Sequence, residues 1–280
     1  MKNIILDTDL GGDPDDLFAL IMTMNSPELQ LDLIVTNDEH KGDRVRFTKK
    51  FFQIFGKEVP IVAGIDVGKT TCFVVGDMIK DYDTDVQTNF IEQIKEVVEK
   101  NDLTYYVCIG PQSNLAKFIE THPELEYKVK VLIMGGAINY RHEDLAEHNI
   151  RYDVESAIIV FNSNWNKRYV ISDITFTEKI KITQDTDFYK KLDALNNPFS
   201  DFIIESMHCF FKALFPATMM HDPLTLSYLI NDNLIKFETK KLSMDEKGII
   251  RLDENGQDIV VSTFADYEPF WKLFEERIFQ

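Results

Sequence analysis

The chain has 280 residues, 44% hydrophobic and 28% charged, so it can bury a large core. Its formal net charge of −17 argues against a nucleic acid or an anionic membrane as partner, because both bind basic surfaces. No apolar run is long enough to span a bilayer, no signal peptide precedes the first predicted strand, and the three cysteines are widely spaced, which together favour a cytoplasmic protein.

Short apolar runs alternate with stretches of helical periodicity over the first two thirds of the chain. The runs rich in Val, Ile and Tyr predict strands at 4–6, 31–35, 59–64, 105–110, 129–136 and 168–174. The stretches between them predict helices at 15–25, 44–56, 88–100, 114–121 and 154–162. This alternation predicts an α/β fold with a mostly parallel sheet, helices on both faces and a site at the carboxyl ends of the strands.

The last third of the chain has a different pattern. Residues 199–213 predict a helix, and a second helix is expected to begin near Pro223. Residues 237–262 alternate around "DEKG" and "DENG", which predicts a small antiparallel piece before a closing amphipathic helix in "YEPFWKLFEERIF". No linker or repeat interrupts the chain, so we expect residues 1–280 to form a single domain.

The stretch "NIILDTDLGGDPDDLFAL" (3–20) has five aspartates within ten residues, between a predicted strand and a predicted helix: Asp7, Asp9, Asp13, Asp15 and Asp16. Asp13 suits an N-cap, and Asp15 and Asp16 complement the positive end of a helix dipole. Capping does not explain Asp7 and Asp9, which end the strand and lie on the same side of it. Carboxylates this close repel one another in a cleft, so either their pKa values rise or a cation such as Ca²⁺ or Mg²⁺ compensates them.

Three motifs from other classes fit this chain poorly. An EF-hand loop counted from Asp7 has Phe18 where Glu is required. The D-x-D-x-T/V motif of haloacid dehalogenase-type phosphatases fits Asp7 and Asp9 but has Gly11 in its last position. "AGIDVGKT" (63–70) matches a relaxed P-loop, yet Ala63 replaces the first glycine and a poor helix sequence follows.

The block "DTDLGGDPDDLFAL" resembles the N-terminal signature of the nucleoside hydrolases, the inosine–uridine-preferring family, whose common form is D-x-D-x-G-x-D-D-x-x-A-L. The turn here is two residues longer. Alignment on the helix places Asp15 and Asp16 at the paired aspartates, whereas alignment on the strand would use Asp13. Further resemblances follow in the family's order over nearly the whole chain: "GPQSNLA" (110–116), "MGGA" (134–137), "AEHNIRYDVESA" (146–157), "SDITF" (172–176) and "HDPLT" (221–225).

The resemblance implies an enzyme that hydrolyses the N-glycosidic bond of ribonucleosides, with a Ca²⁺ that binds the water and the ribose diol. Three carboxylates and one main-chain carbonyl would bind the ion: Asp9, Asp16, Asp222 and Ser113. Asp9 would also be the general base. His221 matches the position of the leaving-group acid, although aromatic side chains such as Phe210 and Phe211 could do part of that work. The implied substrate-binding residues are Asp15, Asp38, Met134, Asn139, Glu147, Asn149 and His221.

The chain departs from the family pattern around the expected substrate pocket. Asp38 stands where many members have Asn, and His148 replaces the usual aromatic residue between Glu147 and Asn149. These departures leave open a relative that binds nucleosides without turnover, with a metal-dependent phosphatase and a P-loop NTPase as less favoured alternatives. Family members are usually dimers or tetramers, so the resemblance also implies a homo-oligomer with a small nucleoside as its ligand.

Overall fold

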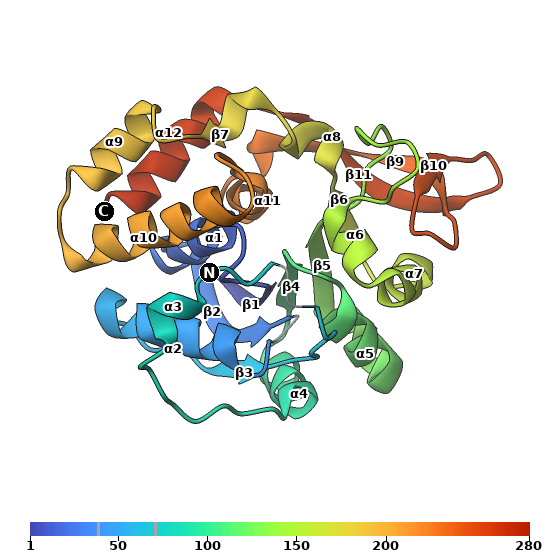
Figure 1. Ribbon diagram of the computed structural model, residues 1–280. Coiled ribbons are helices and arrows are strands. Elements are labelled where there is room, and N and C mark those ends of the chain that lie inside the picture. The colour runs from blue at the N-terminus through green and yellow to red at the C-terminus, as the bar shows by residue number, and fades with distance from the viewer. Residues whose placement is uncertain (38–39, 70–71) are drawn as a thin grey trace.

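The computed structural model describes residues 1–37, 40–69 and 72–280 and contains a nine-stranded sheet (Figure 1). Its strand order is β10-β9-β11-β6-β5-β4-β1-β2-β3. From β11 to β3 every neighbouring pair is parallel, whereas β9 runs antiparallel to β10 and β11. The strands are β1 (Lys2–Thr8), β2 (Leu29–Thr36), β3 (Ile61–Ala63), β4 (Thr104–Cys108), β5 (Val129–Met134), β6 (Lys167–Val170), β9 (Ile235–Met244), β10 (Ile250–Leu252) and β11 (Gln257–Ala265).

Helices cover both faces of the sheet, and strand β1 shows why. Its side chains alternate between the two faces, so Ile4 and Leu6 enter one core and Ile5 enters the other. The first core includes α1, α2, α10, α11 and α12, and the second includes α4, α5 and α7. The helices are α1 (Asp15–Met24), α2 (Asp43–Phe55), α3 (Gly76–Ile79), α4 (Phe90–Lys100), α5 (Ser113–Thr121), α6 (His148–Tyr152), α7 (Val154–Asn162), α8 (Ser172–Thr175), α9 (Asp187–Asp193), α10 (Pro198–Ala213), α11 (His221–Ile230) and α12 (Tyr267–Ile278).

The expected α/β architecture is confirmed, and one predicted strand is partly wrong. The runs at 4–6, 31–35, 59–64, 105–110 and 129–136 fall on β1 to β5, and the eight predicted helices fall on α1, α2, α4, α5, α7, α10, α11 and α12. The strand expected at 168–174 ends at Val170, and α8 follows it. Its neighbour β5 ends at Met134, so the next N–H groups donate elsewhere, from Ile171 to Ser262 Oγ and from Ser172 to the Gly136 carbonyl.

The predicted antiparallel piece is present, but it extends the main sheet. Strand β9 pairs with both β10 and β11, and β11 joins the parallel strands through β6. A separate two-stranded sheet is formed by β7 (Lys181–Ile182) and β8 (Thr218–Met219). The relaxed P-loop pattern does not lead into a helix at its lysine, because the next helix among the described residues begins at Gly76, and Thr70 lies outside those residues. None of the helices in the described ranges is long and apolar enough to cross a membrane.

Asp7 connects the carboxyl end of the central strand β1 to its neighbours β4 and α5. Its side chain is fully buried and accepts hydrogen bonds from Tyr106 Oη on β4 at 2.7 Å and from Asn114 Nδ2 on α5 at 2.9 Å. Burial raises the pKa of Asp7 to about 7, and these hydrogen bonds oppose the rise. Asp7 therefore connects β1 with the strand and the helix beside it, instead of entering the pocket.

We predict that Tyr106→Phe lowers the free energy of unfolding by about 1–3 kcal/mol, because Asp7 loses its nearest donor while it stays buried. Urea denaturation followed by circular dichroism measures this loss. Tyr169→Phe is the matched control, since the Tyr169 hydroxyl is buried and has no partner within the described structure. We expect that control to change stability by less than about 0.5 kcal/mol or to raise it. Equal losses in both variants would contradict the role given to Tyr106.

Candidate active site

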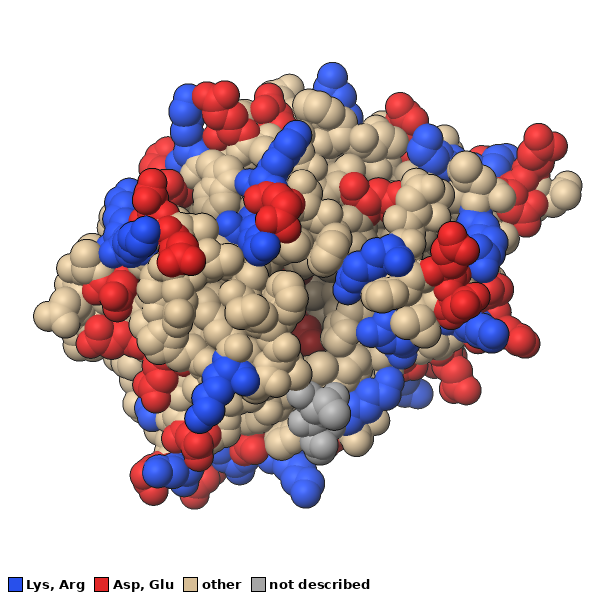
Figure 2. All heavy atoms as spheres, turned by 45° about the horizontal axis from the view of Figure 1, so that its top comes forward, with Lys and Arg blue, Asp and Glu red and all other residues tan. Residues whose placement is uncertain are grey.

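A cavity of about 460 Å³ opens at the carboxyl ends of the parallel strands. This is the edge at which α/β sheets place their ligand sites. Figure 2 shows the opening as a hollow with an acidic side chain at its floor. Six carboxylates line the cavity: Asp9, Asp13, Asp15, Asp16, Glu147 and Asp222.

The tight turn after β1 brings four of these acids together. Gly11 has a φ of +103°, and a Cβ there would meet the Phe73 ring at 2.6 Å, so only glycine fits. Arg44 of α2 is fully buried beneath this turn and donates from Nη1 to the main-chain carbonyls of Asp9 and Leu10, the latter at 2.8 Å. Its guanidinium also lies 5.4 Å from the centroid of the Phe73 ring. The turn is thus held by a buried cation that binds its backbone.

Asp15, Asp16 and Asp222 form the closest group of carboxylates. One oxygen of each lies within 4.8 Å of the other two, and all three residues are buried. Asp15 and Asp16 come from the first turn of α1 and Asp222 from the first turn of α11, where the Asp222 N–H donates to Asp15 Oδ2 at 3.3 Å. Burial first, and then the neighbouring carboxylates, raise the pKa of each well above the ordinary value of an aspartate.

This donor set fits a hard divalent cation. Oxygen ligands from several carboxylates are what Ca²⁺ and Mg²⁺ bind, and a cation would relieve the repulsion that now raises the pKa values. Asp9 faces the same group, since its charge is the largest electrostatic cause of the raised pKa of Asp16. The sequence-predicted residues Asp9, Asp16 and Asp222 are therefore brought together, and the structure adds Asp15 to them.

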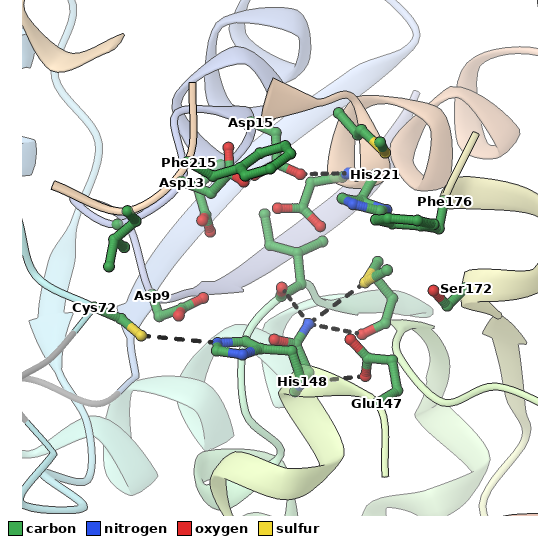
Figure 3. Close-up of a pocket in the computed structure, with 18 of the residues that line it drawn as sticks. Asp9, Asp13, Asp15, Cys72, Glu147, His148, Ser172, Phe176, Phe215 and His221 are labelled. Carbon is green, nitrogen blue, oxygen red and sulfur yellow. Dashed lines mark hydrogen bonds between the residues drawn. The ribbon is translucent and has the colours of Figure 1, made fainter. Parts of the chain in front are cut away.

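Asp13 occupies a different place from Asp15. It lines the cavity but accepts a hydrogen bond from Thr218 Oγ1 of β8, and desolvation raises its pKa. In Figure 3 Asp13 and Asp15 lie near each other above Asp9. Both candidate residues for the ribose thus reach the cavity, and only Asp15 belongs to the carboxylate group with Asp16 and Asp222.

Glu147 and Asn149 form the facing wall with Met134. The Glu147 carboxylate accepts from the N–H groups of Gly136 and Asn149, each at 3.0 Å, so the start of α6 fixes its position. The Asn149 Nδ2 donates to the carbonyls of Ile109 at 3.0 Å and Met134 at 3.1 Å. These three predicted residues all line the cavity, and the ends of β4 and β5 hold them there.

Two histidines lie on opposite sides of the cavity (Figure 3). His221 Nδ1 lies 2.7 Å from Thr175 Oγ1, and burial together with the charge of Arg141 lowers its pKa to about 3. Its imidazole is therefore neutral at pH 7. His148 Nε2 lies 4.0 Å from Cys72 Sγ, and burial likewise lowers the pKa of His148.

Other sequence-predicted residues lie elsewhere. The Ser113 hydroxyl donates to Asp153 Oδ2 at 2.5 Å, and Ser113 is not among the residues that line the cavity. Asn139 also lies outside the cavity, because its Nδ2 donates to Asp173 Oδ1 at 2.8 Å. Phe210 reaches the cavity, whereas Phe211 packs against the core. Asp38 lies outside the described residues.

Several residues that line the cavity are not among those that the sequence motifs indicated. They come from connecting segments and include Cys72, Tyr140, Arg141, Leu214 and Phe215. Nothing in the periodicity of a loop says which of its side chains turn inward. One available signal was the high aromatic content after residue 209, where large apolar side chains continue beyond the predicted end of a helix.

Known proteins share this fold and sequence pattern. A family model described as "Inosine-uridine preferring nucleoside hydrolase" matches residues 4–272. The pyrimidine-specific ribonucleoside hydrolase RihA of Escherichia coli O7:K1 (strain IAI39 / ExPEC) is 26% identical over 309 residues, covering 98% of this chain and 97% of that protein. RihA of Escherichia coli O81 (strain ED1a) is 26% identical over 269 residues, with 88% and 85% covered.

Solved structures of nucleoside hydrolases show the same fold. An inosine-guanosine nucleoside hydrolase has a TM-score of 0.83 at 18% identity, with 99% of both chains covered. A purine-preferring ribonucleoside hydrolase from Gardnerella vaginalis has a TM-score of 0.82 at 23% identity, covering 99% of this chain and 98% of that one.

We predict that Arg44→Met lowers the free energy of unfolding by about 2–4 kcal/mol, because the carbonyls of Asp9 and Leu10 lose a charged donor in the core. Arg46→Met is the control. Arg46 lies on the same helix and pairs near the surface with Asp43 at 3.0 Å, so its loss should cost less than about 1 kcal/mol. Denaturant titration of both variants measures the difference, and a mild effect at Arg44 would refute its role in holding the turn.

Proposed function

The chain belongs to the inosine–uridine preferring nucleoside hydrolase family, and from this premise we propose that it works with a Ca²⁺ ion bound by its buried carboxylates and with Asp9 as general base. Hydrolysis of the N-glycosidic bond of ribonucleosides follows from the family itself. The observation that carries the finer proposal is the convergence of Asp15, Asp16 and Asp222 beside Asp9 in one cavity.

The ion would be held by Asp9, Asp16 and Asp222, with Asp15 as the adjoining carboxylate. When bound, it supplies compensation of the buried negative charge, acidification of a water molecule and an anchor for the ribose diol. The Ser113 carbonyl stays a predicted ligand, and the Ser113 side chain is engaged with Asp153. A cytoplasmic location, which rests on the sequence pattern, and a homo-oligomeric state, which rests on the resemblance, are further parts of the proposal.

Each polar side chain of the cavity has its own role in the proposed hydrolysis. Asp9 takes the proton from the attacking water, and its own charge favours the cationic, oxocarbenium-like sugar that forms as the bond to the base breaks. Asp15, which lies beside Asp16 and Asp222, accepts a hydrogen bond from a ribose hydroxyl. Glu147 and Asn149 hold other hydroxyls from the facing wall, where the backbone contacts described above fix their positions.

His221 supports the departing base in this proposal. Its neutral imidazole can donate one N–H to the base, and a ring of Phe176 lies parallel to it at 6.3 Å between centroids. An apolar wall that excludes water strengthens such a contact. The known relatives are named for pyrimidine and for purine substrates, so the preferred base has to be measured.

The test is release of free base from a panel of nucleosides, followed by chromatography with and without a chelator. Chelator-sensitive release is expected. Asp9→Asn should lower kcat by about 10²- to 10⁴-fold, the range of a general base, while the circular dichroism spectrum stays that of the wild type. Asp83→Asn, which changes an exposed carboxylate far from the cavity, is the control. A nearly unchanged rate in Asp9→Asn would exclude Asp9 as the base.

Calcium binding can be tested without turnover. Calcium at about 100 times its dissociation constant should stabilise the fold by about 2.7 kcal/mol and raise the thermal midpoint. Asp222→Asn removes one charge of the site and should weaken calcium affinity at least about tenfold in calorimetry. Wild-type affinity in Asp222→Asn would show that Asp222 is not a ligand.

A further inference from the structure

Arg141 lies on the cavity wall that the proposed function assigns to the departing base. Its guanidinium carbon is 4.2 Å from the centroid of the Phe176 ring and 4.6 Å from that of Tyr140. The Phe176 ring is in turn 6.3 Å from the His221 ring, between centroids, with an angle of 15° between their planes. Arg141, Phe176 and His221 therefore follow one another as flat groups along one wall.

This wall leads from the buried carboxylates to the mouth of the cavity. Asp222, the neighbour of His221 in the chain, is 3% exposed, whereas Phe176 is 42% exposed and Arg141 is also an exposed residue. Figure 3 shows Phe176 against His221, on the side of the cavity away from Cys72. Arg141 thus occupies the outer end of the wall.

The guanidinium group of Arg141 is held by aromatic rings and is open along its edge. Its contacts with the rings of Tyr140 and Phe176 use the flat face of the group. Among the residues that the structure describes, Arg141 makes no hydrogen bond or ion pair, so its N–H groups can donate to a ligand. Its charge reaches into the cavity, because after burial it is a cause of the lowered pKa of His221 and contributes to that of His148.

The departing base develops negative charge on the side that faces away from the ribose. The base leaves with the electrons of its bond to C1′, and in uracil and hypoxanthine this charge spreads to a ring carbonyl oxygen, O4 or O6, away from the glycosidic nitrogen. A ribose whose diol is bound at the buried carboxylates directs this outer edge toward the mouth of the cavity. A cationic donor at the outer end of the wall is placed where such charge has to be stabilised.

We propose that Arg141 is a catalytic residue that binds this carbonyl oxygen and stabilises the negative charge of the departing base. The inference rests on the proposed function and adds one residue to it. Water adds its oxygen to C1′ and gives a proton to Asp9, while the bond from C1′ to the base nitrogen breaks and the base leaves as an anion. Arg141 stays protonated and holds this anion until a proton from solvent neutralises it, and Asp9 returns its proton to solvent.

The role of Arg141 depends on the leaving group. Cytosine and adenine have an amino group where uracil and hypoxanthine have the outer carbonyl, and an amino group cannot accept a hydrogen bond from a guanidinium. A leaving group that is a stable anion by itself, such as p-nitrophenolate, needs no such donor. Arg141 should therefore accelerate the hydrolysis of uridine and inosine more than that of other ribosides.

The experiment compares leaving groups on the same sugar. Hydrolysis of uridine, inosine, adenosine and p-nitrophenyl β-D-ribofuranoside is measured with calcium for the wild type, Arg141→Met and Arg251→Met. Arg141→Met should lower kcat on uridine and inosine by about 10- to 100-fold, the size of one hydrogen bond from a charged group. KM should change less, because the charge on the base develops only in the transition state.

The other substrates and the second variant are the controls. Arg141→Met should keep its rates on adenosine and on the p-nitrophenyl riboside within about threefold of the wild type, since neither gains the bond that is lost. Arg251→Met removes the same charge from an exposed residue outside the cavity and should behave as the wild type on every substrate.

Several results would overturn the inference. Unchanged rates of Arg141→Met on uridine and inosine would show that the base does not meet Arg141, and equal losses on all four substrates would give Arg141 a role unrelated to the leaving group. Wild-type cleavage of the p-nitrophenyl riboside alone would leave calcium-dependent hydrolysis standing and reject the support of the base by Arg141.

If the wild type cleaves no substrate, the proposed function fails, and binding decides the inference separately. Calorimetry then compares inosine with adenosine in the presence of calcium. Tighter binding of inosine that disappears in Arg141→Met and persists in Arg251→Met would support the contact with the carbonyl oxygen. Equal binding of the two nucleosides by the wild type would reject it.

Discussion

The whole site depends on several aspartates being held close together in a buried place where strand β1 ends. Asp9 follows β1, Asp15 and Asp16 open α1, and Asp222 opens α11, so three separate elements deliver carboxylates to one desolvated place. Burial and mutual repulsion both disfavour ionisation, which is why the pKa values of Asp15, Asp16 and Asp222 rise together. A fold that only needed stability would not keep this arrangement, because apolar residues of similar size would relieve it.

The surrounding structure holds the acids in place against that repulsion. Arg44 binds the carbonyls of the turn from below, and Asp7 joins β1 to Tyr106 and Asn114 behind it. These contacts act on the backbone and on neighbouring elements, and none of them uses a carboxylate that lines the cavity. A rigid frame around a poised group is what catalysis needs, since displacement of a reacting group by about 1 Å can cost two orders of magnitude in rate.

The sequence predicted those residues of the site whose positions follow from short stretches of neighbouring residues. Strand endings, helix starts and short motifs led to Asp15, Asp16, Glu147, Asn149 and Asp222, and all of them line the cavity. It failed where position depends on long-range contacts. The Asn139 amide donates to Asp173 instead of facing the cavity, and β6 is shortened because β5 ends beside it. Neither Arg141 nor Phe215 has a pattern of its own, because their places follow from how loops pack against elements far away in the sequence.

The buried carboxylates pose one electrostatic problem. When Asp15, Asp16 and Asp222 are ionised they repel one another within a few ångströms of low-dielectric protein, and either protonation or a bound cation relieves that repulsion. Protons and a divalent cation would therefore compete for the same oxygens. Linkage makes such a competition reciprocal, so a bound cation would lower the pKa values of the three carboxylates to the extent that their protonation weakens cation binding. The raised pKa values and the close approach of the three carboxylates are in this view two sides of one charge balance.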